Sequence, residues 1–343
     1  MSFTKNTYYF HFIALIFGLI LFSFLNINWG SVSIPFKEIL STLIGNTPSK
    51  ASWKTIIINY RLPKTITAIL VGSGLAVSGL LMQTLFRNPL AGPFVLGISS
   101  GASLGVALFV LGSGIFGGIL GLSIQNLGLP LAASLGAFLV LTAVIIAANK
   151  VRNTMSILII GLMFSALTSS IINVLSYFSE AEQVKQFVFW GFGSLGNLTW
   201  NEISIFSGIY CLSAIGIFFS IKPLNSFLLG ENYAKSLGIN TKRSRNIILV
   251  ITSLLTGIIT AFCGPIAFIG LAVPHITKLI FKTSNHKILV PAVAITGAII
   301  LLICDTIAQL PQYQFTLPIN AITSLFGAPV VIWLLIRKKK IYI

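Results

Sequence analysis

The chain has very few charged residues for its length. Lys, Arg, Asp and Glu together make up 8% of its 343 residues, and the mean hydropathy is +0.96. Because a soluble domain carries roughly 25% charged residues, this chain lacks the groups that would cover a water-facing surface. The sequence therefore predicts an integral membrane protein with little room for a soluble domain.

Several motifs that would indicate an enzyme are also absent. The sequence has no HExxH zinc motif, no GxSG serine motif and no pair of aspartates within apolar segments. It also has no GxxxxGK[ST] phosphate loop. An intramembrane enzyme is therefore disfavoured, and any ATP hydrolysis must come from a separate chain.

Cysteine and histidine are too few and too scattered to predict a metal site. The three cysteines (Cys211, Cys263 and Cys304) lie among apolar residues without CxxC spacing, which favours small buried side chains. His11 and His286 lie near span ends, whereas His275 lies well inside an apolar segment; packing or a helix end is favoured over a ligand role for His275. We predict no metal and no cofactor in this chain.

Ten apolar segments follow one another along the sequence. Long apolar runs without strict alternation favour helices over a barrel, and about 20 apolar residues cross a membrane as a helix. The stretch 93–130 is glycine-rich, so its boundaries are open. The expected spans are 8–27, 64–85, 93–112, 127–148, 155–177, 203–221, 246–263, 265–281, 288–308 and 318–336.

Charge predicts the orientation of these spans. The net charge of +16 could indicate nucleic-acid binding, but the basic residues lie in short loops between apolar segments. With both termini inside, about sixteen of the 22 Lys and Arg residues, the C-terminal group 337–340 included, fall on the inner side. The positive-inside rule therefore places both termini in the cytoplasm. We expect a bacterial plasma (inner) membrane protein that contacts lipid and no nucleic acid.

A polar stretch at about 222–245 interrupts the apolar pattern on the inner side. Its sequence runs from Gly230 through Glu231 to Gly238, and basic residues follow. A small helix bounded by glycines at the surface would be a contact site through which another protein could move this chain. A surface linker helix without a partner is the alternative.

The outer loop at about 28–63 breaks the charge rule. Five of the six outer basic residues lie between the first two spans, and they end in Arg61 and Lys64. Two interpretations stay open: anchoring to lipid head groups, or a docking patch for an acidic partner, since complementary charge steers encounter.

Four blocks of sequence resemble the iron-chelate and cobalamin branch of ATP-binding-cassette importer permeases. They extend over nearly the whole chain in the order and spacing of that family. The blocks are Arg61-Leu-Pro-Lys64 to Met82-Gln83; Asn88-Pro-Leu-Ala91 with Leu96-Gly-Ile-Ser-Ser-Gly-Ala102; Gly230-Glu231, Ala234 and Leu237-Gly238; and Gly264 to Gly270 with Val273-Pro-His275, Asp305, Leu317-Pro318 and Gly327-Ala-Pro329.

The resemblance implies an all-α permease of the type II importer architecture, with 1–343 as a single transmembrane domain of about ten helices, several short or broken. It implies a second permease subunit (a homodimer), two cytoplasmic ATPase subunits that bind ATP and Mg²⁺, and an external substrate-binding protein. The cargo would be an iron chelate, a ferric siderophore first, with haem or cobalamin as alternatives. An ion-coupled secondary transporter is less favoured, because no carboxylate lies near a span centre.

The resemblance also implies roles for single residues. The residues implied to couple the permease to the ATPase are Gly230, Glu231, Ala234, Leu237 and Gly238. Ala234 and Leu237 are expected on one face of the short helix. Docking of the binding protein falls to Arg61 and Lys64. A basic residue that the family's cobalamin member uses late in the chain is replaced here by Gln309.

A translocation pathway is implied for Gly97, Ser99, Ser100, Gly101 and Ser103. Small and hydroxylated residues give a wide, weakly binding wall, although close helix packing uses small residues equally well. Thr154 and Met155 match the inner gate. Asp305 lies near the outer end of a span, where a structural hydrogen bond is at least as well supported as a functional role.

Overall fold

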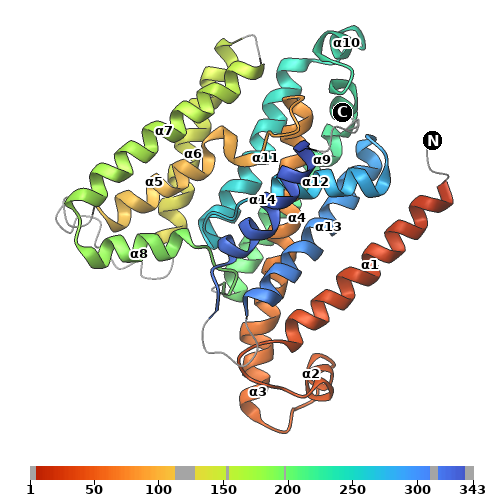
Figure 1. Cartoon of the computed structure of the whole chain (residues 1–343), viewed down its shortest axis with the longest axis vertical. Helices are drawn as coiled ribbons and strands as arrows, with labels where there is room; N and C mark the ends of the chain where they lie inside the picture. Colours follow the sequence, from red (N-terminus) through yellow and green to blue (C-terminus); the bar gives the residue numbers. More distant parts are fainter. Residues whose placement is uncertain (1–4, 113–127, 152–153, 197, 310–315, 337–343) are drawn as a thin grey trace. The chain divides into compact units, whose positions relative to one another are not determined.

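A computed structural model describes residues 5–112, 128–151, 154–196, 198–309 and 316–336, and these residues form helices (Figure 1). The C-terminal basic group 337–340 and part of the stretch 93–130 lie outside the described residues. In chain order the elements are α1 (Lys5–Asn28), α2 (Phe36–Leu43), α3 (Ala51–Ile56), η1 (Ile57–Arg61), α4 (Leu62–Leu85), η2 (Pro93–Leu96), α5 (Ile98–Val110), α6 (Gly128–Lys150), α7 (Thr154–Phe178), α8 (Ala181–Gly191), α9 (Trp200–Phe227), α10 (Glu231–Ser236), α11 (Thr241–Cys263), α12 (Ile269–Phe281), α13 (His286–Ala308) and α14 (Ile319–Ile336).

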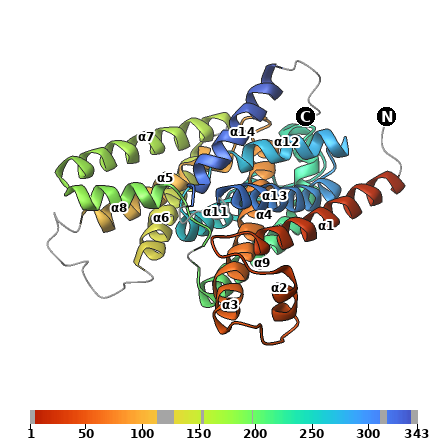
Figure 2. The same ribbon diagram turned by 60° about the horizontal axis from the view of Figure 1, so that its bottom comes forward.

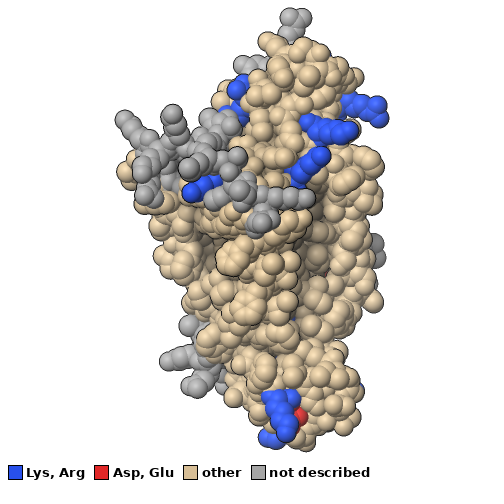
Figure 3. Space-filling model, turned by 90° about the vertical axis from the view of Figure 1, so that its right-hand side faces the viewer, with Lys and Arg blue, Asp and Glu red and all other residues tan. Residues whose placement is uncertain are grey.

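The helices agree with the ten expected spans. Within the described residues, seven helices are long and apolar enough to cross a membrane by length and composition, and three apolar helices are shorter. The shorter ones are Ile98–Val110, Ile269–Phe281 and Ile319–Trp333. The face shown in Figure 3 is mostly uncharged, with Lys and Arg in separate small groups. The chain is thus an all-α, multi-pass membrane protein.

The contacts divide the chain into two compact units. The first takes its residues from Met1–Val77, Ser194–Tyr210 and Ala267–Tyr342. In this unit α1 lies alongside α13 in both views (Figures 1 and 2), and α12, α13 and α14 contact one another. The expectation of a single domain over 1–343 stays a prediction.

The second unit takes its residues from Ser78–Gly193 and Cys211–Ile266. Its centre is α5, which contacts α6, α7, α8 and α11. Glycines permit the close approach of α5 and α6. A Cβ on Gly101 would lie 2.6 Å from the carbonyl oxygen of Gly136, and one on Gly105 would lie 2.0 Å from that of Ala132.

The outer loop between the first two spans is more ordered than the sequence suggested. Residues expected only as a loop form α2, α3 and η1, and the apolar helical stretch runs without a break over Ala51–Leu85. A small hydrophobic cluster of Ile27, Ile34, Ile39 and Ile57 holds this region to the end of α1. Burial of apolar side chains supplies the stabilisation that the weak local helix signals lacked.

Two other expectations needed correction. The span expected at 265–281 begins as a helix only at Ile269, because Phe268 adopts a left-handed backbone with φ +66° and the segment before it is not helical. Cys211, expected to be buried, is exposed on α9, whereas Cys263 and Cys304 are buried as expected.

Candidate functional site

The polar stretch at 222–245 contains the short helix that was expected. α10 (Glu231–Ser236) follows Gly230, whose φ of +109° and ψ of 158° only glycine adopts without strain. Gly238, just past the helix, has φ +77°. Within α10 the Nζ of Lys235 lies 3.4 Å from Oε1 of Glu231. The glycine-bounded helix is therefore confirmed, while its coupling role stays a prediction.

The expectation that Ala234 and Leu237 share one face for docking was wrong. Ala234 is fully buried, whereas Leu237 is 56% exposed. The physical reason is that α10 ends at Ser236, so Leu237 is its C-cap and leaves the helical register. Leu237 and the outward side of α10 remain available to a partner, and Ala234 fixes α10 to its own unit.

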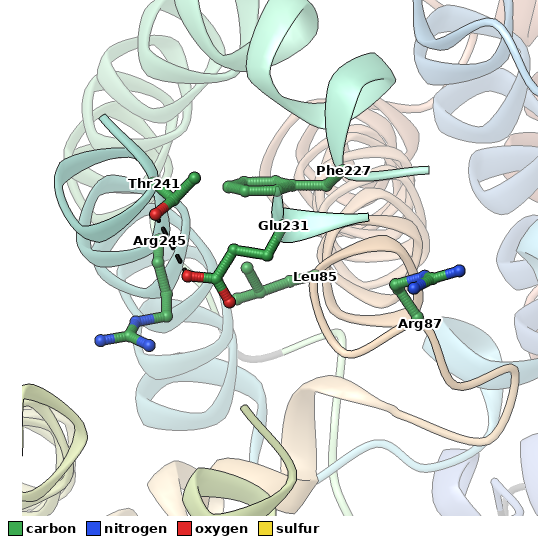
Figure 4. A pocket seen from close by; sticks show the side chains of 6 residues that line it. All are labelled: Leu85, Arg87, Phe227, Glu231, Thr241 and Arg245. Atoms are coloured by element: carbon green, nitrogen blue, oxygen red, sulfur yellow. Dashed lines mark hydrogen bonds between the residues drawn. The ribbon is translucent and has the colours of Figure 1, made fainter. Parts of the chain in front are cut away.

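A small pocket lies behind α10. It is lined by residues from the ends of α4, α9, α10 and α11, and its volume is about 40 Å³. In Figure 4 the Glu231 carboxylate accepts a hydrogen bond from Thr241 at 3.1 Å and lies beside the stem of Arg245. The lining residues are Leu85, Arg87, Phe227, Glu231, Thr241 and Arg245.

Lys64, expected to dock a binding protein, lies in a polar network of the first unit. Its Nζ is 3.1 Å from Oδ1 of Asp305, and the Lys64 side chain keeps 20% of its surface exposed. Asp305 also accepts hydrogen bonds from Asn26 and Gln309, both at 2.8 Å. Thr65 donates to Asn26 at 2.8 Å. The structural role weighed for Asp305 is thus confirmed: it joins α1, α4 and α13.

Arg61 is placed differently from Lys64. Only 8% of its surface is exposed, and its guanidinium donates to the carbonyl oxygens of Ile27, Asn28 and Val32. Arg61 therefore holds the chain that follows α1 and is not a free surface charge. A docking role for Arg61 stays a prediction, and any such role would act through this loop.

The five residues expected to line a pathway separate into two groups. Gly97, Ser99 and Gly101 are buried, and a Cβ on Gly97 would lie 2.9 Å from the carbonyl oxygen of Gly161. Ser99 shares a hydrogen bond of 3.1 Å with Thr260. These contacts fit helix packing, the alternative weighed from the sequence. Ser100 and Ser103 are half-buried, and the pathway role of all five residues stays a prediction.

The expected inner gate lies at the start of α7. Thr154 is the first residue of that helix, and its side chain lies outside the described part of the chain. Met155 is 47% exposed. The two residues come directly after the connection from α6, and their gate role stays a prediction. Among the described residues, no three His, Cys, Asp or Glu side chains come together in a way that could hold a metal ion.

Comparison with known proteins decides the family. The model of the FecCD transport family matches residues 18–337. The chain belongs to this family. Two similar relatives are also permeases. The hemin transport system permease protein HmuU of Yersinia pestis is 34% identical over 318 residues, 91% of each chain. The vitamin B12 import system permease protein BtuC of Salmonella schwarzengrund is 33% identical over 326 residues, 92% of this chain and 97% of that one.

The fold of this FecCD-family permease has a counterpart among solved structures. One that shows an inward-facing conformation of a metal-chelate type ABC transporter superposes with a TM-score of 0.81, at 28% identity over 95% of this chain and 98% of that one. The chain is therefore a transmembrane permease with the architecture of metal-chelate importers.

Sequence reasoning missed three contributors to these sites. Asn26 is one polar residue within a long apolar segment, and only the fold brings it to Asp305. Gln309 was noted as a departure from the family, yet it donates to the same carboxylate. Arg245 was counted only as inner-side charge, although it is buried. The spacing of Asp305 and Gln309, four apart on a helix, was the one available signal.

Proposed function

We propose that this FecCD-family permease is the membrane subunit of an ATP-driven importer for an iron chelate, with a ferric siderophore as the first candidate cargo. It would receive the cargo from an external binding protein and release it into the cytoplasm. Haem and cobalamin are the alternatives, because relatives named for hemin and vitamin B12 match the chain over its length. All three cargoes are metal ions held in an organic shell.

The observation that carries this proposal is α10. A six-residue polar helix between two long apolar helices, bounded by Gly230 and Gly238, has no use in crossing a membrane. Leu237 and most of α10 are exposed, while the buried Ala234 packs the helix against its own unit. Since the sequence has no phosphate loop, two ATPase subunits that bind ATP and Mg²⁺ would act on this helix from the cytoplasm.

The charge pattern supports the remaining topology. Basic residues concentrated in alternate loops support a topology with both termini in the cytoplasm of a bacterial inner membrane. A second copy of the permease would complete the pathway. Ser100 and Ser103 of α5, half-buried within one unit, would face the cargo there, and Thr154 and Met155 would lie at the inner gate.

The outer end of the first unit supports docking of an acidic partner. Lys64 presents a partly exposed ammonium whose position is set by Asp305. Arg61 organises the loop below it by binding three carbonyl oxygens. We therefore assign the direct contact with the binding protein to Lys64 and assign Arg61 to loop geometry. Lipid head groups are the competing partner for the same charges.

Reconstituted transport tests the proposal. The permease, its ATPase and its binding protein would be placed in liposomes, and uptake of ⁵⁵Fe-labelled ferrichrome, hemin and ⁵⁷Co-cobalamin would be measured with and without ATP. We expect ATP-dependent uptake of one of the three probes. Uptake that persists without the ATPase but collapses with a protonophore would show a secondary transporter and overturn the proposal.

A further inference from the structure

The first two turns of α11 make side-chain contacts in two directions. Toward α10, Thr241 donates a hydrogen bond of 3.1 Å to Oε1 of Glu231. The first of these turns is fixed by Asn240, whose side chain accepts the backbone N–H of Arg243 at 2.9 Å. Because an N-cap holds the start of a helix in place, the hydrogen bond between Thr241 and Glu231 joins α10 to a fixed turn of α11.

In the other direction, the second turn of α11 contacts the C-terminal end of α6. The Nη2 of Arg245 donates to the carbonyl oxygen of Ala148 at 3.0 Å, and the Nδ2 of Asn246 donates to Oδ1 of Asn149 at 3.1 Å. The last carbonyls of a helix lack partners within it, and a cation there is favoured by the helix dipole. Arg245 thus caps α6 from a neighbouring helix.

Arg245 is held with part of its donor capacity unused. It is 92% buried, and its Nε has no hydrogen-bond acceptor among the residues that the structure describes. Its stem lines the pocket behind α10, next to the Glu231 carboxylate, while its guanidinium points away from that carboxylate (Figure 4). The pocket leaves space into which the Glu231 carboxylate could shift. A buried donor without a partner is costly, so a second arrangement with Glu231 on Arg245 is accessible.

We propose that Arg245 is a positioning residue that couples α10 to the C-terminal end of α6. When α10 is pushed toward the pocket, the Glu231 carboxylate leaves Thr241 and pairs with Arg245, which loosens the cap on Ala148. Along the chain, α6 ends at Lys150 and α7 begins at Thr154. The inference rests on the proposed ATP-driven function, and it names residues that would transmit the movement of α10 toward the inner gate.

The test compares Arg245→Gln with a matched control in the complete transporter. Arg243→Gln removes an exposed guanidinium from the same helical turn. For Arg245→Gln we expect ATP hydrolysis within about twofold of wild type and about tenfold less substrate imported per ATP hydrolysed. Arg243→Gln should keep the wild-type ratio. Arg245→Lys, which can still donate to Ala148 but offers no planar fork, should restore part of it.

A structural readout separates coupling from simple destabilisation. Single spin labels at Ser236→Cys on α10 and Met155→Cys on α7 would be placed in a background where Cys211, Cys263 and Cys304 are alanine. In wild type and Arg243→Gln, we expect ATP binding to change the mobility of both labels. In Arg245→Gln, the α10 label should still respond and the α7 label should not.

The outcomes distinguish this inference from the proposed function. A wild-type complex without ATP-dependent uptake overturns the proposed function. An active wild type, with Arg245→Gln that keeps the wild-type transport ratio and both label responses, overturns the role of Arg245 alone. If Arg245→Gln does not assemble, Asn246→Ala removes the adjacent bond to Asn149, and we expect a smaller loss in the same ratio; an unchanged ratio contradicts the inference.

Discussion

The ammonium of Lys64 lies 3.1 Å from a carboxylate oxygen of Asp305, across α4 and α13. The carboxylate is 96% buried, and it also receives hydrogen bonds from Asn26 of α1 and Gln309. One acidic group therefore joins three helices of the first unit. The pair has a second consequence, because it fixes the position of the charge that we assign to docking.

Asp305→Asn should destabilise the permease. The substitution leaves the ammonium of Lys64 without its counter-charge, and breaking a buried pair from one side costs about 3–5 kcal/mol. Because Lys64 keeps 20% exposure, we expect about 2–3 kcal/mol, seen as a lower midpoint of thermal unfolding in nanodiscs. In a double-mutant cycle with Lys64→Met, the coupling should be about 1–3 kcal/mol; strictly additive effects would show that the pair contributes nothing.

The docking assignment makes a separate prediction for Lys64. Lys64→Glu should lower the affinity for the loaded binding protein by about tenfold or more, because like charges across an interface repel. The affinity of wild type should also fall with rising salt. Lys185→Glu reverses another outer basic residue, on α8, and should have little effect in the same surface-plasmon measurement. Equal losses in the two variants would indicate a general effect of charge.

The crossing of α4 and α13 depends on two facing glycines. A Cβ on Gly72 would lie 2.4 Å from the carbonyl oxygen of Gly297, and a Cβ on Gly297 would lie 2.4 Å from that of Gly72. Gly72→Ala must therefore separate the helix backbones, at a cost of about 1–3 kcal/mol. Gly208 on α9 has nothing within 4 Å of its Cβ position, so Gly208→Ala should be neutral or slightly stabilising in the same unfolding assay. A neutral Gly72→Ala would contradict this packing.

The spans and the inner helix could be predicted because their signals are local. Apolar runs of membrane length have few alternatives in hydrocarbon, and a polar segment bounded by Gly230 and Gly238 marks its own ends. The resemblance to a family added the order of the blocks, and the family comparison confirmed it.

The remaining features depend on tertiary contacts that no local pattern encodes. Arg61 looked like a free outer charge until the fold placed three carbonyl oxygens around it. Leu237 left the face of Ala234 because α10 ends one residue earlier. Gly97 and Gly101 resembled a pathway wall, yet they meet backbone atoms of neighbouring helices. In each case the sequence gives the residue type, and packing decides its use.

The outer loop should respond to acid through Glu38. The hydroxyl and then the backbone N–H of Ser49 donate to its carboxylate, and with nearby Lys37 they lower the pKa of Glu38 below its ordinary value. A lowered folded-state pKa means that the stabilisation is complete above the ordinary pKa of about 4.3 and is lost as the pH falls through the folded value.

The measurement is hydrogen exchange of the segment that contains α2 and Ser49, corrected for intrinsic rates. At pH 6 the wild type should be better protected than Glu38→Gln, and the difference should vanish in acid below the folded pKa of Glu38. Glu182→Gln, on the exposed α8, should not change this segment. A difference that persists in strong acid would contradict the role of the Glu38 carboxylate.

Gly230→Ala should impair the coupling of ATP hydrolysis to transport through α10 more than Gly238→Ala does. Gly230 has φ +109° and ψ 158°, a region that costs a residue with a Cβ about 1–3 kcal/mol, whereas φ +77° at Gly238 lies nearer the left-handed region that other residues enter at smaller cost. Space is not the limit, because the closest atom to a Cβ on Gly230 is Nη1 of Arg87 at 3.5 Å. The backbone must therefore move, which shifts the start of α10 and the carboxylate of Glu231.

We expect Gly230→Ala to lower the substrate imported per ATP by about fivefold or more, Gly238→Ala by less, and Gly238→Asn least, since Asn tolerates the left-handed conformation. The reverse order would show that the conformation at Gly230 does not set the position of α10.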